Sequence, residues 1–99
     1  MIVVRDVFQL KFGMAKDAIA LMKEAKPLFD ADMSSPIRVL VDVTGQAYTM
    51  VLESSYPSLG EYEKEMSSGM GDPRWQDWYE RFKPVCESSF REIWRNVDL

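Results

Sequence analysis

The last quarter of the chain concentrates side chains that suit the binding of aromatic or anionic small molecules. Three tryptophans, one tyrosine and two phenylalanines lie between residues 75 and 94. Indole and phenol rings offer a flat apolar face with one polar N–H or O–H group, and arginine binds carboxylates through its planar fork. We therefore predict a small-molecule site whose candidate ligand-binding residues are Arg5, Tyr48, Trp75, Trp78, Tyr79, Arg91 and Trp94.

Each group of this predicted site has a defined role. The three tryptophans would stack on an aromatic or apolar ligand, Tyr48 or Tyr79 would form a hydrogen bond to it, and Arg91 or Arg5 would hold its anionic group.

A structural interpretation of the same residues stays open. A helix that packs on a sheet needs an apolar stripe, and Trp75, Trp78, Tyr79 and Phe82 have the three-to-four spacing that places them on one helix face. The strand arginines would equally well form ion pairs with Asp42 or Glu53. The sequence does not choose between a pocket and a core.

The absence of histidine from the sequence limits the chemistry. Ser-His-Asp and Cys-His catalysis, imidazole zinc sites and histidine-ligated haem are excluded, and we expect neither a metal nor a cofactor. The single cysteine, Cys86, is expected to be structural. Asp6 interrupts an apolar strand face and must be paired, lie near an edge, or have a pKa raised by desolvation, which would make it a candidate general base.

Composition and charge exclude further classes of function. The chain has 99 residues, of which 46% are hydrophobic and 28% charged, which predicts one globular domain over residues 1–99. Its 16 acidic and 12 basic residues give a net charge of -4, opposite to that of a typical nucleic-acid-binding protein. No membrane span or signal peptide is recognisable, so we expect a cytoplasmic protein with no nucleic-acid or membrane partner.

Hydrophobic periodicity predicts four strands and two helical layers. Two-residue alternation indicates strands over residues 2–12, 37–44, 47–53 and 88–97, with a tight turn at Gly45-Gln46. Three-to-four spacing from Met14 indicates a helix that kinks or restarts at Pro27.

The second helical layer is predicted in two parts. Ser58 and Glu61 match a capping box that starts a short helix ending near Met66. Residues 67–71 form a break or a mobile lid, and Asp72-Pro73 starts the aromatic helix, which Pro84 kinks or ends. The order β-α-β-β-α-β is that of a ferredoxin-like α+β fold, with an antiparallel sheet and helices on one face.

Apolar residues on both faces of the predicted strands imply a partner. The face away from the helices is expected to include Val3, Val7, Leu40 and Ile93. A second copy packed sheet to sheet would cover this surface, so we predict a homodimer with a barrel-like interface.

The C-terminal half resembles the NIPSNAP-type proteins of the dimeric α+β barrel superfamily. The similarity lies in residues 75–85, Trp-Gln-Asp-Trp-Tyr-Glu-Arg-Phe-Lys-Pro-Val, and residues 88–95, Ser-Ser-Phe-Arg-Glu-Ile-Trp-Arg, and extends more loosely to the first strand and Lys11-Phe12-Gly13. The resemblance implies the fold and the dimer. It assigns no reaction and no catalytic residue.

Two branches of the same superfamily offer chemical comparisons. Its haem-degrading members depend on a histidine ligand, which this chain lacks. Its cofactor-free monooxygenases oxidise a polycyclic phenol in a pocket of Trp, Tyr, Asn and Arg, and similar residue types occur here, although the only asparagine is Asn96. The resemblance to this branch makes cofactor-independent oxygenase or isomerase chemistry the reaction class expected of the predicted pocket. The alternative function, from a different class, is a non-catalytic dimeric protein-interaction module whose aromatic residues are all core.

Overall fold

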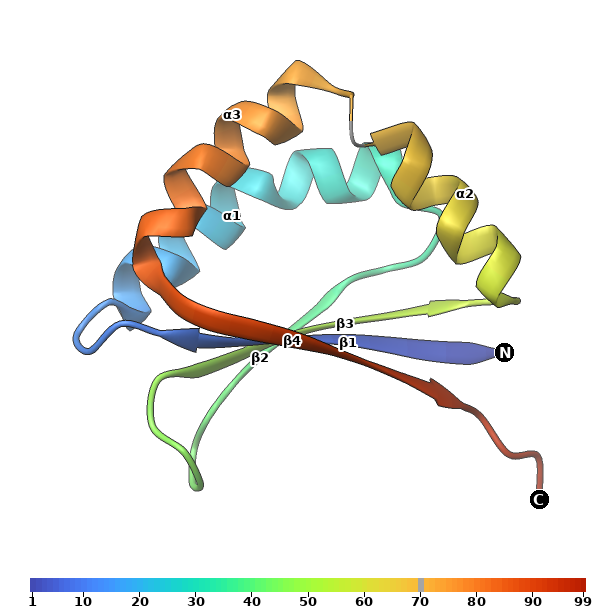
Figure 1. The fold of residues 1–99 in the computed structure, drawn as a ribbon, viewed down its shortest axis with the longest axis horizontal. Coiled ribbons are helices and arrows are strands. Elements are labelled where there is room, and N and C mark those ends of the chain that lie inside the picture. Colours follow the sequence, from blue (N-terminus) through green and yellow to red (C-terminus); the bar gives the residue numbers. More distant parts are fainter. Residues whose placement is uncertain (70) are drawn as a thin grey trace.

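A four-stranded antiparallel sheet carries the helices of the chain on one face (Figure 1). The computed structural model describes residues 1–69 and 71–99. Its elements are β1 (Ile2–Leu10), α1 (Ala15–Asp32), β2 (Arg38–Val41), β3 (Thr49–Tyr56), α2 (Leu59–Gly69), α3 (Pro73–Phe82), a 3₁₀ turn (Lys83–Val85) and β4 (Cys86–Arg95). The strand order β2-β3-β1-β4 and the helix placement confirm the predicted ferredoxin-like α+β fold.

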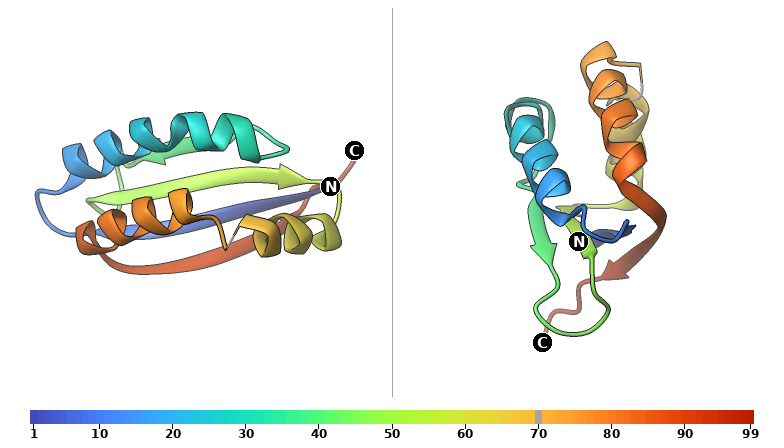
Figure 2. Two further views of the ribbon diagram at one scale, coloured as in Figure 1. Left: turned by 90° about the horizontal axis from the view of Figure 1, so that it is seen from above. Right: turned by 90° about the vertical axis from the view of Figure 1, so that its left-hand side faces the viewer.

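The helix layer has two rows, which Figure 2 shows from above and from the end. One row is α1, and the other is α2 followed by α3. Helix α1 continues through Pro27 as one 18-residue helix, so of the two predicted alternatives, a kink or a restart, the restart is excluded. Its predicted apolar stripe is buried and consists of Ala18, Met22, Ala25 and Phe29.

Capping residues determine where α2 and α3 begin. Ser58 Oγ accepts a hydrogen bond from Glu61 N at 3.3 Å, and Asp72 Oδ1 accepts one from Arg74 N at 2.9 Å. Both starts agree with the prediction. Helix α2 extends to Gly69, beyond its predicted end, and Met70 of the predicted break or lid lies outside the described residues.

The connection between β2 and β3 is longer than the predicted tight turn. Strand β2 ends at Val41 and β3 begins at Thr49. Side chains add to the backbone bond from Asp42 N to Thr49 O in this loop: Asp42 Oδ1 accepts from Thr49 N at 3.0 Å, and Gln9 Nε2 donates to Ala47 O at 3.0 Å. These bonds stabilise an open loop, and they take the place of a two-residue hairpin turn.

The core is divided into two clusters along the sheet. The larger one packs α1 and α3 against Leu10 and Met50, and includes Trp78 and Phe82. The smaller one joins α2 to the sheet through Val4, Tyr56 and Tyr62. Helical side chains therefore cover the two ends of the sheet separately.

Trp78 belongs to the larger cluster. Its indole is stacked on Phe82 with ring centroids 4.9 Å apart, and its Nε1 donates to Leu21 O at 2.7 Å. Only 6% of the residue is exposed. A satisfied polar group and a buried ring make Trp78 a core residue that also reaches the edge of a cleft.

The outer face of the sheet is uncovered in the single chain. The register pairs Val3 with Trp94 and Val7 with Phe90, and all four residues lie on this face. Trp94 is 56% exposed and Phe90 is 60% exposed. Ile93 is opposite Val4 and so faces the helices, which corrects its predicted placement. Glu53 forms ion pairs with Arg38 and Arg5 on the outer face, at 2.9 Å and 3.5 Å.

Truncating Trp78 tests its assignment to the core. We expect Trp78→Ala to lower the free energy of unfolding by about 3–5 kcal/mol, because it leaves a cavity and removes a hydrogen bond. The neighbouring Tyr79, which is 52% exposed, is the control, and Tyr79→Ala should cost less than about 1 kcal/mol. Urea unfolding measures both, and equal losses would contradict the assignment.

Candidate functional site

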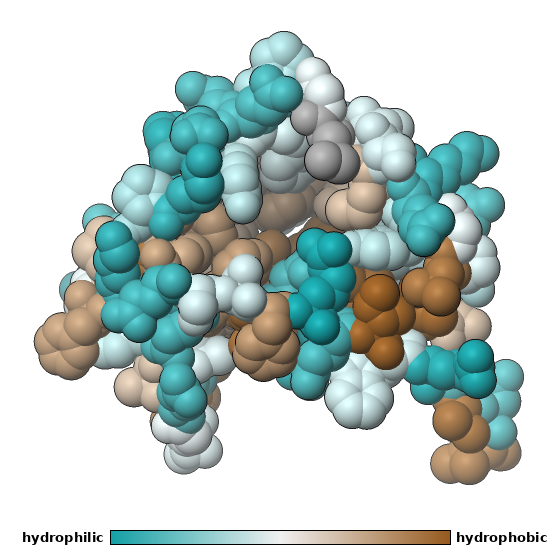
Figure 3. Space-filling model, in the orientation of Figure 1, coloured by the Kyte–Doolittle hydropathy of each residue, from teal (hydrophilic) through white to brown (hydrophobic). Residues whose placement is uncertain are grey.

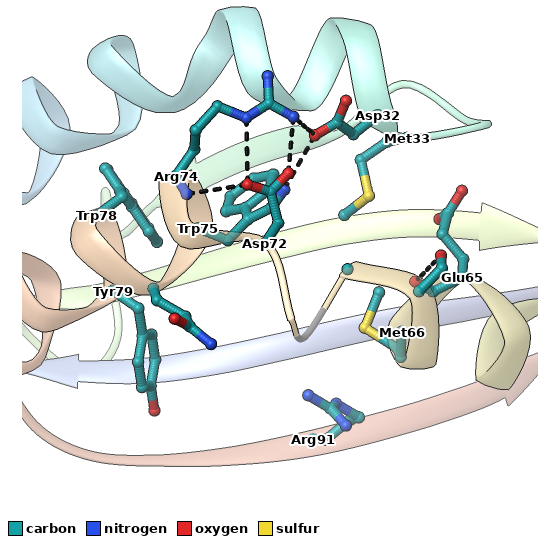
Figure 4. Close-up of a pocket in the computed structure, with 13 residues that line it drawn as sticks. Asp32, Met33, Glu65, Met66, Asp72, Arg74, Trp75, Trp78, Tyr79 and Arg91 are labelled. Carbon is teal, nitrogen blue, oxygen red and sulfur yellow. Dashed lines mark hydrogen bonds and ion pairs between the residues drawn. The ribbon is translucent and has the colours of Figure 1, made fainter.

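A cleft of about 840 Å³ lies where the ends of the helices meet above β4 (Figure 4). The end of α1, the end of α2 and the first two turns of α3 form its walls, and Arg91 of β4 enters it from the sheet. Figure 3 shows this side of the molecule hollowed between the helices and β4, with hydrophobic side chains inside the hollow. The cleft is open to solvent and is large enough for a small organic molecule.

The walls of the cleft are mostly apolar. Met33 and Met66 enter it from opposite sides, and Trp75 and Tyr79 project from α3 (Figure 4). The Trp75 ring is 5.1 Å from that of Phe29 and 6.0 Å from that of Trp78, measured between centroids. The methionines adapt to different shapes, whereas these packed rings are fixed in place.

An ion-pair cluster ties the start of α3 to the end of α1. Arg74 Nη2 lies 2.9 Å from Asp32 Oδ2 and 2.7 Å from Asp72 Oδ2, and Trp75 Nε1 donates to Asp32 Oδ2 at 3.3 Å. Hydrogen bonds from the Arg74 side chain and backbone lower the pKa of Asp72. This cluster holds Trp75 at the rim, and the Arg74 charge is balanced by two carboxylates.

Arg91 and Asp6 form an ion pair on the helix-facing side of the sheet. They are directly opposite each other on β4 and β1, and Arg91 Nε donates to Asp6 Oδ1 at 2.5 Å. The guanidinium lies over the Tyr62 ring, 5.6 Å from its centroid. The hydrogen bond to Asp6 raises the pKa of Arg91. Of the three alternatives predicted for Asp6, the structure shows the paired one.

Glu65 places a second charged group at the α2 end of the cleft. Its Oε1 accepts a hydrogen bond from Ser34 N at 2.7 Å. Burial alone would raise the pKa of Glu65, but hydrogen bonds from Tyr56 and Ser34 outweigh it and lower the pKa. Burial, and next the contact with Glu65, raise the pKa of Tyr56. Glu65 is therefore a stably ionised carboxylate.

Comparison with solved structures identifies the fold. A NIPSNAP family protein from Agrobacterium tumefaciens superposes with a TM-score of 0.89 at 22% identity, covering 98% of this chain and 93% of the other. An uncharacterized NIPSNAP domain protein from Burkholderia xenovorans gives 0.88 at 14% identity, covering 98% and 95%. The chain has the NIPSNAP fold.

A related group of structures matches less closely than these two. A putative antibiotic biosynthesis monooxygenase from Bordetella bronchiseptica superposes on the NIPSNAP fold of this chain with a TM-score of 0.76 at 13% identity, covering 97% and 96%. No protein-family model and no curated protein matches the sequence. The predicted resemblance to NIPSNAP-type proteins is thus confirmed at the level of the fold.

The NIPSNAP fold brings four of the seven predicted ligand-binding residues to one cleft. They are Trp75, Trp78, Tyr79 and Arg91. Although Trp75, Trp78 and Tyr79 are close in sequence, their roles differ, because Trp78 is buried in the core and Tyr79 is half exposed. The aromatic stripe is therefore partly core and partly cleft wall.

The other three predicted residues lie elsewhere. Trp94 is three positions from Arg91 on β4, and the two-residue alternation of a strand places them on opposite faces. Arg5 lies on the outer face and pairs with Glu53. Tyr48 precedes β3 in a left-handed conformation with φ of 57°, and its ring packs against Phe12 at 5.1 Å.

Sequence reasoning missed the contributions of the helix ends. Asp32, Met33, Glu65, Met66 and Arg74 line the cleft and were not among the predicted site residues. The only local signal was the N-cap at Asp72, which locates the start of α3. The described residues contain no cluster suited to a metal ion, and no described helix is long and apolar enough to cross a membrane.

The ionised state of Glu65 predicts a pH dependence of stability. A carboxylate whose pKa is lower in the folded state stabilises the fold above its unfolded pKa of about 4.3, and this contribution is lost as the pH falls through the folded value. Between about pH 6 and about pH 3, wild type should therefore lose more stability than Glu65→Gln.

Urea unfolding at the two pH values measures this difference. Glu63→Gln, at an exposed position of the same helix, controls for the removal of a surface carboxylate. An identical pH dependence in wild type and Glu65→Gln would show that the bonds to Ser34 and Tyr56 do not stabilise the ionised form.

Proposed function

We propose that this protein binds a small aromatic or apolar anionic molecule in the cleft between its helices and its sheet. The observation that supports this best is the combination of apolar walls, formed by Met33, Met66, Trp75 and Tyr79, with the guanidinium of Arg91. A cavity of this kind suits a ligand with a flat or aliphatic body and one polar end. Its volume of about 840 Å³ is within the range of known ligand sites.

The charged groups of the cleft favour binding over proton-transfer catalysis. General acids and bases work best with a pKa near the working pH. In this cleft the pKa shifts lead away from neutral pH: the pKa values of Glu65 and Asp72 are lowered, and those of Arg74 and Arg91 are raised. These four groups therefore stay charged near neutral pH, which suits them to holding and orienting a ligand.

Cofactor-free oxygenase chemistry is the second candidate. It is favoured by the structural similarity to putative antibiotic biosynthesis monooxygenases and by the aromatic cleft wall. In such a reaction Arg91 would stabilise an anionic substrate, and Trp75 and Tyr79 would hold its rings. Oxygen uptake in the presence of an electron-rich phenol would distinguish this activity from simple binding.

We also propose that a second copy of the chain covers the outer face of the sheet. Phe90 and Trp94 expose large apolar surfaces there, next to Arg5, Arg38 and Glu53. A face that carries apolar groups and charges of both signs is self-complementary under two-fold symmetry. The proposed assembly is thus a homodimer formed through the outer sheet faces of two copies.

Filling the cleft tests the binding function. Gly69 lines the cleft, and a Cβ atom placed there would meet nothing within 4 Å, so Gly69→Trp puts an indole into open space. We expect it to weaken the binding of the aromatic probe 2-naphthoate at least about tenfold by isothermal titration calorimetry.

Gly60→Trp, on the same helix but outside the cleft, is the matched control and should retain binding. Wild-type protein that fails to bind 2-naphthoate, or equal binding by both variants, would count against the cleft as the binding site.

Dimerisation is tested on the outer face. Size-exclusion chromatography with light scattering should give a dimer for wild type, and Trp94→Glu should shift it to a monomer because a charge is buried in an apolar interface. Tyr79→Glu changes a residue of similar exposure on the helix side and should stay dimeric. A monodisperse wild-type monomer at micromolar concentration would refute the dimer.

A further inference from the structure

Arg91 enters the cleft with one edge of its guanidinium already occupied. Its Nε donates to Asp6 Oδ1, and within residues 1–69 and 71–99 neither of its Nη groups makes a hydrogen bond. Arginine carries five N–H donors in a planar fork, so the donors of both Nη groups stay available. About half of the side chain, 51%, is exposed. These donors are accessible to a molecule in the cleft.

Two contacts fix the orientation of this guanidinium. Asp6, on the central strand β1, holds Nε, and the Tyr62 ring lies under the guanidinium at 5.6 Å. Tyr62 is itself buried and stacked edge-to-face on Tyr56, with centroids 5.1 Å apart. A carboxylate on a strand and an aromatic ring on a helix thus restrain the guanidinium, which would otherwise rotate freely in solvent.

The Tyr62 hydroxyl adds an unsatisfied polar group beside this pair. Among the described residues its buried Oη has no hydrogen-bond partner. Burial raises the pKa of Tyr62, so the hydroxyl stays protonated. A buried hydroxyl without a partner is unfavourable. Because Tyr62 does not line the cleft, its ring and not its hydroxyl is assigned the contact with Arg91.

The remaining charges of the cleft limit the charge of its ligand. Three carboxylates line it, Asp32, Glu65 and Asp72, against the two guanidinium groups of Arg74 and Arg91. Arg74 is already paired with both aspartates. Arg91 is the guanidinium of the described lining that has a single carboxylate partner, and a second negative charge on the ligand would meet repulsion from the three carboxylates of the cleft.

We propose that the ligand is a monocarboxylate, that its carboxylate accepts hydrogen bonds from the Nη groups of Arg91, and that Asp6 and Tyr62 are positioning residues for this guanidinium. This inference rests on the proposed binding function. It adds the chemical class of the ligand's polar group and two residues outside the cleft lining.

Three probes with the same aromatic body test the charge selection on the wild-type protein. They are 2-naphthoate, the neutral 2-naphthamide and the dianionic 2-naphthyl phosphate. We expect 2-naphthoate to bind at least about tenfold more tightly than either of the others by isothermal titration calorimetry, because a neutral amide forms no charged pair with Arg91 and a dianion is repelled by the three carboxylates of the cleft.

The outcomes separate this inference from the proposed function. If 2-naphthamide or 2-naphthyl phosphate binds as tightly as 2-naphthoate, and Gly69→Trp abolishes that binding, the cleft is a ligand site but monocarboxylate recognition is refuted. If none of the three probes binds, both proposals fail.

Replacing Asp6 by Asn tests its positioning role through the sign of the effect. If Asp6 orients Arg91, Asp6→Asn weakens 2-naphthoate binding about tenfold and leaves 2-naphthamide binding unchanged. If Asp6 is only a nearby negative charge, its removal tightens 2-naphthoate binding, which would overturn the positioning role. Thermal melting of the variant shows whether it is folded, and the wild-type comparison of probes does not depend on it.

Two substitutions at Tyr62 test the aromatic platform. Tyr62→Phe retains the ring and should keep 2-naphthoate binding within about threefold of wild type, whereas Tyr62→Leu removes the ring and should weaken it about tenfold. An equal loss in both variants would refute the platform and assign the effect to the hydroxyl.

Discussion

The ion pair between Asp6 and Arg91 is the constraint on which the architecture of this protein depends. It lies on the helix-facing side of the sheet, between Val4 of the smaller core cluster and Leu10 of the larger one. A helix cannot pack its apolar face over a charged pair without a cost in desolvation. The core is accordingly divided, α2 covers one part and α3 the other, and the cleft lies between them above Arg91.

This division explains why the cleft is held by helix ends. Helices α2 and α3 meet near the ion pair, and the cluster of Arg74 with Asp32 and Asp72 fixes the start of α3 against the end of α1. On the other side, Glu65 ties α2 to Ser34, just beyond α1. The walls of the cleft are therefore anchored at both sides, although no single helix spans it.

The sequence predicted local features well because their causes are local. The N-caps at Ser58 and Asp72 and the buried stripe of α1 depend on residues within two turns of one another. The two-residue alternation also located the strand that the structure has as β4. It did not tell which side the helices would cover, because that depends on the pairing of β4 with β1.

Features that depend on distant residues were beyond such reasoning. Ile93 was assigned to the outer face, and only its register against Val4 shows that it faces the helices. The length of the loop between β2 and β3 is set partly by the Gln9 amide, which is 38 residues away from its partner Ala47. The cleft walls at Met33 and Met66 likewise come together only when the two helix rows are placed on the sheet.

The distribution of the three tryptophans gives the protein a built-in set of optical reporters. Trp78 is stacked on Phe82 in the core, Trp75 stands at the rim of the cleft beside Asp32, and Trp94 lies on the outer sheet face. Emission from an indole follows the polarity of its surroundings, so each ring senses a different event. Variants that retain a single tryptophan would let folding, cleft occupancy and subunit association be followed separately by fluorescence in one protein.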